Sequence, residues 1–186
     1  MTITEHIAAV RREMAEAARE SGRSERDIFL VGASKMNDAA ACQEAIAAGV
    51  DALGENRVQE MTAKLAQNAY DGAPLHFIGH LQRNKVKYIV GKVALIHSVD
   101  TYRLAEEINI QAKKRGIIVP ILVEVNIAGE ETKFGTTAED AMLLVEEISK
   151  LENVRIKGLM TIAPFVENPE DNRLYFRKIK QLSVDI

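Results

Sequence analysis

The sequence predicts an α/β domain in which a parallel sheet is covered by helices. Short apolar or β-branched runs alternate six times with amphipathic segments of helical period, and this strict alternation is typical of repeated β-α units. Polar side chains gather where the apolar runs end, which is the edge where α/β folds build their sites. An open doubly wound sheet and a (β/α)₈ barrel both satisfy the pattern, although the three-glycine dinucleotide fingerprint is absent.

The composition is that of one globular domain. The chain has 186 residues and a formal net charge of −3, which favours neither nucleic acid nor a membrane surface as a partner. No apolar run reaches the roughly 20 residues that a membrane span needs, and the amphipathic, charged N-terminal segment is unlike a signal peptide. Cys42 is the single cysteine, so we expect no disulfide framework. Together these features predict a cytoplasmic location, and because no exposed apolar stripe demands a partner we expect a monomer.

The order of elements is one helix followed by six β-α units. The expected strands are apolar and cover residues 27–34, 51–55, 75–79, 93–98, 117–127 and 154–162. The expected helices carry apolar residues three and four apart and cover residues 2–21, 38–49, 58–65, 83–90, 100–116, 136–151 and 168–182.

Local signals set the starts of several helices. Thr2 with Glu5, and Thr136 with Glu139, have the spacing of a capping box. Asp100 is expected to cap the helix that follows the fourth strand.

Lys35 ends the first expected strand, directly after the apolar run 29–33 and Ser34. A continuous apolar run indicates a strand buried on both faces, and lysine is costly to bury unless it is paired or used. A desolvated lysine loses proton affinity and becomes an amine nucleophile able to form an imine. The alternative interpretation is a lysine that leaves the strand end and extends its amine into water.

Polar residues also lie within or directly after the other expected strands and could converge with Lys35 on one site. These residues are Glu55, Asn56, His76, His80, His97, Asp100, Glu124, Asn126 and Thr161. Each has a structural interpretation as a cap, a core residue or a surface residue. No histidine and carboxylate trio has a recognisable metal spacing, and no serine elbow is present, so we expect no metal.

Five motifs occur in a fixed order along the chain. They are Ser34-Lys35, G-E-N-R-V-Q-E at 54–60, H-F-I-G-H-L-Q-R-N-K at 76–85, Asn126 with Lys133 and Gly135, and G-L-M-T at 158–161. In this combination the chain resembles the pyridoxal phosphate homeostasis protein family over essentially all of its length.

The resemblance implies a (β/α)₈ TIM barrel of the alanine racemase N-terminal-domain type, with about six β-α units in this chain. Residues 1–186 would then be a single barrel domain that binds pyridoxal 5′-phosphate (PLP) and lacks its two C-terminal strands. It further implies PLP held as an imine, or Schiff base, on Lys35. Asn56, His76 and Met160 would lie beside the cofactor, and Lys133 would be a secondary contact.

The resemblance also implies a PLP (vitamin B6) carrier that buffers the cofactor or delivers it to PLP-dependent acceptor enzymes, with no catalytic residues of its own. One alternative is an amino-acid racemase, which needs a second base. The candidate tyrosines, however, are expected away from the strand ends: Tyr70, Tyr88, Tyr102 and Tyr175. A weaker alternative is a Schiff-base aldolase, for which Glu55 or Glu124 would be the acid/base group.

Overall fold

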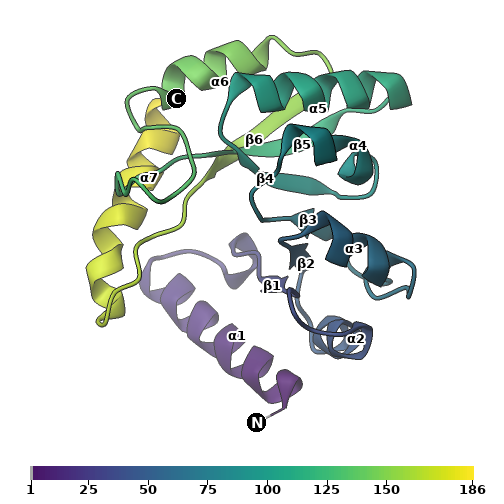
Figure 1. Cartoon of the computed structure of the whole chain (residues 1–186). Coiled ribbons are helices and arrows are strands. Elements are labelled where there is room, and N and C mark those ends of the chain that lie inside the picture. The colour runs from purple at the N-terminus through teal and green to yellow at the C-terminus, as the bar shows by residue number, and fades with distance from the viewer. Residues whose placement is uncertain (1) are drawn as a thin grey trace. The chain divides into compact units, whose positions relative to one another are not determined.

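A computed structural model describes residues 2–186, in which helices and strands alternate (Figure 1). The strands are β1 (Val31–Ala33), β2 (Ala52–Glu55), β3 (Leu75–Phe77), β4 (Leu95–Val99), β5 (Val119–Glu124) and β6 (Val154–Met160). The α-helices are α1 (Ile3–Glu20), α2 (Ala39–Ala47), α3 (Val58–Leu65), α4 (Val86–Ile89), α5 (Tyr102–Arg115), α6 (Ala141–Ser149) and α7 (Arg173–Asp185). Short 3₁₀ turns are η1 (Glu25–Asp27), η2 (Arg83–Lys85) and η3 (Pro169–Asn172).

The strands follow one another in the sheet in sequence order, from β1 to β6. Each is followed by at least one helix, so the predicted series of six β-α units and the predicted α/β class are confirmed. The chain divides into two compact units, one ending at His76 and one covering Phe77–Ile186, and the boundary falls inside β3.

In the first unit, β1 and β2 are parallel, with Val31 opposite Ala52 and Ala33 opposite Gly54. All four residues of β2 are buried, as expected for an inner strand of a parallel sheet. Helices α2 and α3 pack against β2, and α1 packs against α2. The amphipathic stripe of α3 supplies the fully buried Met61 to this core.

Strand β1 is shorter and more exposed than the sequence predicted. The predicted strand 27–34 is reduced to three residues, and its burial on both faces is wrong: Val31 and Gly32 are half-buried and Ala33 is exposed. Phe29, which precedes the strand, is 58% exposed. The physical reason is that an apolar cleft, lined in part by Leu30, Gly32 and Ala33, lies between β1 and the helices α1 and α2, so packed side chains do not fill the space over this strand.

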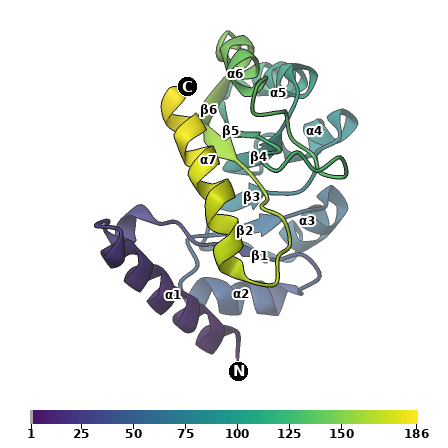
Figure 2. The same ribbon diagram turned by 90° about the vertical axis from the view of Figure 1, so that its left-hand side faces the viewer.

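In the second unit, β4, β5 and β6 are parallel neighbours. Helices α4, α5 and α6 lie side by side along one face of these strands in both ribbon views (Figures 1 and 2). The β5–β6 register shifts between the pairs Ile121–Ile156 and Leu122–Gly158, so β6 holds one extra residue. Gly158 has φ +151°, a conformation that few other residues adopt, and it marks this β-bulge.

Helix caps are confirmed at some positions and wrong at others. The Thr2 hydroxyl accepts from the Glu5 amide at 3.2 Å while the Glu5 carboxylate accepts from the Thr2 amide at 2.8 Å, so the first capping box is confirmed. The residue that caps α5 is Thr101, which accepts from the Leu104 amide, and not Asp100. Aspartate and threonine are both good caps, so residue type does not decide between Asp100 and Thr101. Thr101 is the cap because α5 begins at Tyr102.

The predicted capping box at Thr136 and Glu139 is also wrong. The contact forms one residue further along, where the Thr137 hydroxyl lies 2.7 Å from the Asp140 carboxylate and 3.1 Å from the Asp140 amide. Thr136 is instead drawn into a parallel bridge with Val125, because backbone pairing with the end of β5 competes with capping.

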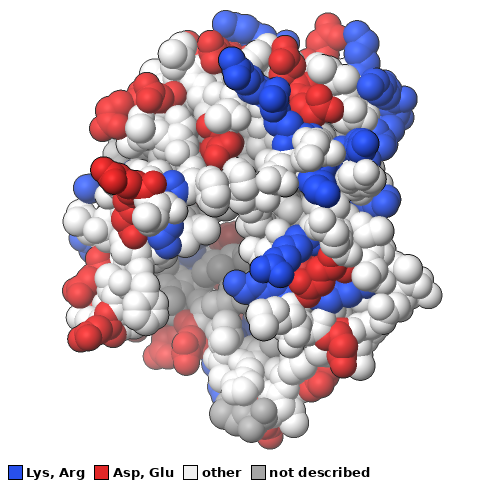
Figure 3. Space-filling model, in the orientation of Figure 1, with Lys and Arg blue, Asp and Glu red and all other residues white. Residues whose placement is uncertain are grey.

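The last helical region begins where the sequence predicted. The Asn168 side chain accepts from the Glu170 amide and Pro169 occupies the first position of η3, after which α7 continues. Among residues 2–186 no helix is long and apolar enough to cross a membrane. On the face drawn in Figure 3, acidic and basic side chains both occur, in keeping with the small net charge.

Candidate functional site

Lys35 and Asn56 occupy equivalent places after two paired strands. Ala33 lies opposite Gly54, and the Ser34 amide donates to the Gly54 carbonyl at 2.9 Å. Lys35 and Asn56 each stand two residues beyond that pair, so the register brings them to the same edge of the sheet. This is the carboxyl end, where α/β folds place ligands.

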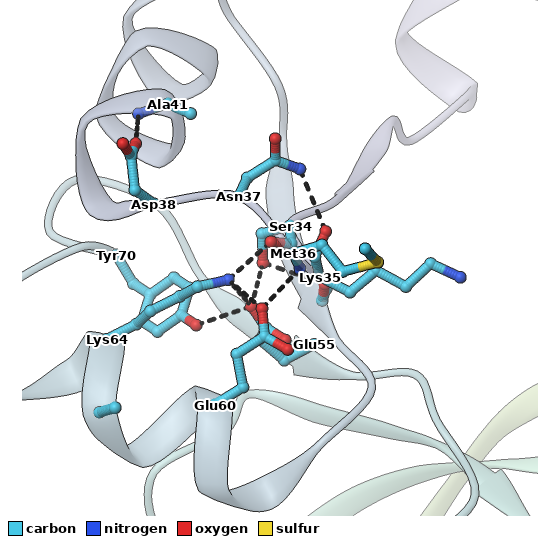
Figure 4. Close-up of polar contacts among 12 residues, drawn as sticks. Ser34, Lys35, Met36, Asn37, Asp38, Ala41, Glu55, Glu60, Lys64 and Tyr70 are labelled. Carbon is cyan, nitrogen blue, oxygen red and sulfur yellow. Dashed lines mark hydrogen bonds and ion pairs between the residues drawn. The ribbon is translucent and has the colours of Figure 1, made fainter.

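The two side chains have different surroundings. Lys35 is exposed, and in Figure 4 its side chain extends away from the neighbouring charged groups. The structure therefore agrees with the alternative interpretation of this lysine and not with the desolvation argument. Asn56 is half-buried, and its Oδ1 atom is buried without a hydrogen-bond partner among residues 2–186. An unpaired buried amide oxygen is unusual and requires an explanation.

Beneath Lys35 lies a buried charge cluster formed by Ser34, Glu55, Lys64 and Tyr70 (Figure 4). The Glu55 Oε1 atom accepts from Lys64 Nζ at 2.5 Å, from Ser34 Oγ at 2.7 Å and from the Tyr70 hydroxyl at 3.1 Å. Glu55 is completely buried, and its second oxygen, Oε2, has no partner in the described part of the chain.

The Lys64 amine uses all of its hydrogen-bond donors in this cluster. Its amine donates to Glu55, to the Ser34 carbonyl at 2.6 Å and to Glu60 at 2.8 Å, and an ammonium group has three donors. Burial lowers the pKa of Lys64, but the hydrogen bonds to the two carboxylates outweigh it, so the pKa is raised overall. Lys64 is therefore held as a cation and is no rival to Lys35 as an amine nucleophile.

Tyr70 belongs to the same cluster. Burial, followed by the charge of Glu55, raises the pKa of its hydroxyl. The hydroxyl therefore stays protonated and donates to Glu55, which makes it a poor general base.

His76 lies in β3 and is 6% exposed. Its ring stacks on Phe29, with ring centroids 5.8 Å apart and planes 8° from parallel. Burial lowers the pKa of the imidazole, so the neutral form is favoured near pH 7. The structure thus places His76 next to β2 within the first unit, on the strand that follows Asn56.

Met160 and Lys133 belong to the second unit. Met160 is the last residue of β6, where it is half-buried opposite Glu124. Lys133 is exposed on the loop after β5, with its amide donating to the Glu130 carbonyl at 3.0 Å. The register of β5 and β6 brings Met160 to the strand edge from which this loop departs.

The loop at residues 126–135 is closed by its own backbone and one amide side chain. Asn126 donates to the Glu130 carbonyl at 2.8 Å and accepts from the Glu130 amide at 3.2 Å. Gly135 has φ +112°, and a Cβ atom there would lie 2.5 Å from the Asn126 nitrogen. Only glycine permits this approach, which accounts for the Asn126 and Gly135 part of the motif.

Glu124 ends β5 and is 5% exposed. Burial, with a further contribution from the charge of Asp100, raises the pKa of its carboxyl to about 7. This carboxyl therefore exists in both protonation states near neutral pH.

An apolar cleft of about 240 Å³ lies between α1, α2 and β1. The lining of this cleft includes Ser34 and Cys42 but neither Lys35 nor Asn56. The cleft is therefore separate from the site that Lys35 and Asn56 form at the ends of β1 and β2. Among residues 2–186 no group of histidine, cysteine and carboxylate side chains has the arrangement of a metal site.

Glu60 and Lys64 were not predicted from the sequence to belong to this cluster. A sequence pattern for them is nonetheless present: Lys64 falls three residues after Met61, inside the apolar stripe of α3, and Glu60 precedes Lys64 by four residues. A lysine in an apolar stripe with a carboxylate at that spacing indicates a paired buried cation.

Similarity to known proteins gives these features a family context. The model of the alanine racemase N-terminal domain family matches residues 6–186. A pyridoxal phosphate homeostasis protein of Aquifex aeolicus is 44% identical over 98% of this chain and 80% of its own length. The chain belongs to the pyridoxal phosphate homeostasis protein family. Its resemblance to that family, predicted from the five motifs, is confirmed, as is the predicted alanine racemase N-terminal-domain type of fold.

Other members of the pyridoxal phosphate homeostasis protein family match over a similar length. The protein of that name from Pseudomonas aeruginosa is 35% identical over the whole of this chain and 80% of its own length. Among solved structures, PipY of Synechococcus elongatus with PLP bound superposes with a TM-score of 0.83 at 30% identity, covering 99% of this chain and 81% of PipY. This chain thus spans about four fifths of the length of these relatives.

Proposed function

We propose that this protein binds PLP reversibly through Lys35 and buffers the cofactor or delivers it to PLP-dependent enzymes. Relatives covering nearly the whole chain are named pyridoxal phosphate homeostasis proteins, and PipY has been solved with PLP. PLP supplies an aldehyde, which a lysine amine attacks to form a Schiff base with loss of water. The exposed amine of Lys35 is accessible to such an aldehyde.

The observation that carries the proposal is the pairing of β1 with β2. The register aligns Ala33 with Gly54 and so brings an exposed amine and a half-buried amide, those of Lys35 and Asn56, to neighbouring strand ends. The Asn56 amide, whose Oδ1 has no partner among the described residues, would hydrogen-bond the cofactor ring. His76, on the next strand, would line the site in its neutral form.

Two residues of the second unit complete the proposed set of cofactor contacts. Met160 would pack against the cofactor from the end of β6, and Lys133 would be a secondary, basic contact from the loop after β5. We propose that both units belong to one PLP-binding barrel domain, because the boundary between them falls within β3 and leaves no linker.

We further infer that the protein is a carrier without a reaction of its own. The curated relatives are named for homeostasis of PLP and not for a catalysed reaction. Tyr70, the tyrosine of the buried charge cluster, donates to Glu55 and has a raised pKa, so it does not provide the second base of a racemase. Glu55, one of the aldolase candidates, is turned toward Lys64 and away from Lys35 (Figure 4).

The proposal extends to partners and location. PLP-dependent acceptor enzymes would receive the cofactor, and the carrier would act as a monomer in the cytoplasm. The single thiol of Cys42 is buried and free, which is compatible with a reducing compartment.

Reduction with borohydride tests the attachment point. The protein is incubated with PLP, reduced, digested and mapped by mass spectrometry. We expect the pyridoxyl adduct on Lys35 and its loss in Lys35→Arg, while Lys133→Arg retains it. An adduct found mainly on Lys133 or another lysine would contradict the proposal.

Asn56→Ala tests the second contact. We expect the dissociation constant for PLP to rise about tenfold, as the loss of one hydrogen bond to a charged ligand predicts, while the thermal unfolding midpoint changes little. Asn172→Ala is the matched control, because Asn172 also has a buried Oδ1 without a partner among residues 2–186 but lies in η3. Equal affinities for wild type and Asn56→Ala would exclude this contact.

Proton exchange separates a carrier from a racemase. The PLP-loaded protein is incubated with L-alanine in deuterated water, and exchange at the α-carbon is followed by NMR. We expect no exchange faster than that caused by free PLP. Rapid exchange that disappears in Lys35→Arg would establish an enzyme instead.

A further inference from the structure

Lys35 sits inside a strained turn at residues 34–37. The Ser34 carbonyl accepts from the Asn37 amide at 3.1 Å, and Met36, the third residue of the turn, has φ +64°. Turns with a positive φ at this place prefer glycine or asparagine. Met36 is neither, and its side chain is 92% exposed, so side-chain packing does not hold the backbone in this conformation.

Helix α3 holds this turn on both sides of Lys35. Lys64 Nζ donates to the Ser34 carbonyl at 2.6 Å, immediately before Lys35. The Glu60 carboxylate accepts from the Met36 amide at 2.6 Å, immediately after it. Both are charge-assisted hydrogen bonds, which are stronger than neutral ones, and they flank Lys35 on both sides of the chain (Figure 4).

The two anchors are themselves fixed. Glu60 and Lys64 pair with each other at 2.8 Å, one helical turn apart. Lys64 also bonds the completely buried Glu55 at the end of β2. The turn is thus connected through α3 to the interior of the sheet, although Lys35 makes none of these side-chain contacts.

We propose that Glu60 and Lys64 are positioning residues that fix the turn so that the Lys35 amine is presented to the aldehyde of PLP. The inference rests on the proposed function and adds two residues to it. Neither residue touches the cofactor: Glu60 and Lys64 act through the backbone of Ser34 and Met36. Releasing the turn would let Met36 return to an ordinary negative φ and redirect the residue before it.

The test uses Glu60→Ala and Glu60→Gln in the full chain. Alanine removes the acceptor for the Met36 amide, whereas glutamine retains an acceptor oxygen but loses the ion pair with Lys64. Glu170→Ala is the matched control, because Glu170 forms an exposed helical ion pair with Arg173 in η3 and α7. Glu60 is itself partly exposed, so we expect both variants to fold.

Two measurements are made on each protein. Hydrogen exchange of the Met36 amide without PLP reports the anchor directly, and the dissociation constant for PLP reports its consequence. In Glu60→Ala we expect at least tenfold faster exchange and about tenfold weaker PLP binding, consistent with one lost charge-assisted hydrogen bond. Glu60→Gln should lie between wild type and Glu60→Ala, and Glu170→Ala should match wild type.

A Lys35→Ala background distinguishes positioning from a general structural effect. If Glu60 acts through Lys35, Glu60→Ala should not weaken the residual, non-covalent PLP binding of Lys35→Ala any further. An equal loss in both backgrounds would overturn the inference, as would wild-type PLP affinity or an unchanged Met36 exchange rate in Glu60→Ala. A wild-type protein without a reducible adduct on Lys35 would instead overturn the proposed function, before any variant is compared.

Discussion

The turn at 34–37 follows β1 and the loop at 126–135 follows β5, and each carries a lysine of the family motif, yet different forces hold them. Charged side chains of α3, Glu60 and Lys64, hold the first segment by its backbone. The second is closed by the Asn126 amide, by a backbone bridge between Val125 and Thr136, and by the close approach of Gly135. The comparison teaches that the segment proposed to carry the cofactor depends on charged side chains of a neighbouring helix, whereas the other depends on its own backbone, one amide side chain and a close approach that glycine permits.

Gly135→Ala should break the second segment and have the largest effect. Its Cβ would overlap the Asn126 nitrogen at 2.5 Å and the Val125 carbonyl carbon at 2.8 Å, in a backbone conformation with φ +112°. We expect the free energy of unfolding to fall by about 4 kcal/mol or more, as for other severe backbone clashes. Urea denaturation followed by circular dichroism measures this.

Gly129→Ala is the matched control in the same loop. Gly129 has φ +70° but no atom within 4 Å of the added Cβ, so only the left-handed backbone penalty of about 1–2 kcal/mol applies. Equal losses for the two variants would show that steric fit at Gly135 does not close the loop.

Lys64→Met should break the first segment. Methionine replaces most of the apolar stem of lysine but leaves the completely buried Glu55 without its cation. Removing one partner of a buried ion pair costs about 3 kcal/mol or more, and urea denaturation at pH 7 measures it. Adding Glu55→Gln should recover part of the loss, because the buried charge is then gone.

Lys113→Met serves as the control for Lys64→Met, because Lys113 lies exposed in the last turn of α5. Its effect should stay within about 0.5 kcal/mol, the usual range for surface substitutions. If Lys64→Met were as mild, the α3 ion pairs would not stabilise the first segment.

Glu124→Gln tests how the stability of the second segment, which follows β5, depends on pH. Glu124 ends β5, where its carbonyl accepts from the Thr136 amide. Its pKa of about 7 in the folded protein lies above the ordinary value of 4.5. The folded state therefore retains a proton that the unfolded chain releases, so the free energy of unfolding should fall as pH rises from about 4.5 to about 7.

The glutamine variant removes this pH dependence. At pH 8 we expect Glu124→Gln to be more stable than wild type by on the order of 2 kcal/mol, since each pKa unit corresponds to about 1.4 kcal/mol and partial hydration reduces the total. At pH 4 the two proteins should be equally stable. Equal stability at both pH values would mean that Glu124 is ionised in the folded state without cost.

Met36→Gly should have the smallest effect and the opposite sign. Glycine adopts the φ of +64° at this position without the steric cost that a methionine side chain causes. Glycine also loses more backbone entropy on folding, which offsets part of this gain. The net gain in unfolding free energy should be about 0.5 kcal/mol. Asn68→Gly is the control, because Asn68 also has a positive φ, +55°, and asparagine tolerates that region; a gain as large there would remove the evidence for strain at Met36.

The sequence by itself determined the elements whose signals are local. The alternation of six β-α units, the Thr2–Glu5 capping box and the Asn168–Pro169 helix start depend on residues within one or two turns of each other. The five motifs likewise placed the chain in its family. Such features survive in the fold because their partners are close along the chain.

Only the tertiary structure decided the features that depend on distant partners. The bridge from Val125 diverted Thr136 from capping α6. Ala33 is exposed because it borders the apolar cleft between α1, α2 and β1. The Lys64 contacts with Glu55 and the Ser34 carbonyl join residues 9 and 30 positions apart. Hydrophobic period alone could not reveal them, because a charged residue is buried only where folding supplies its counter-charges.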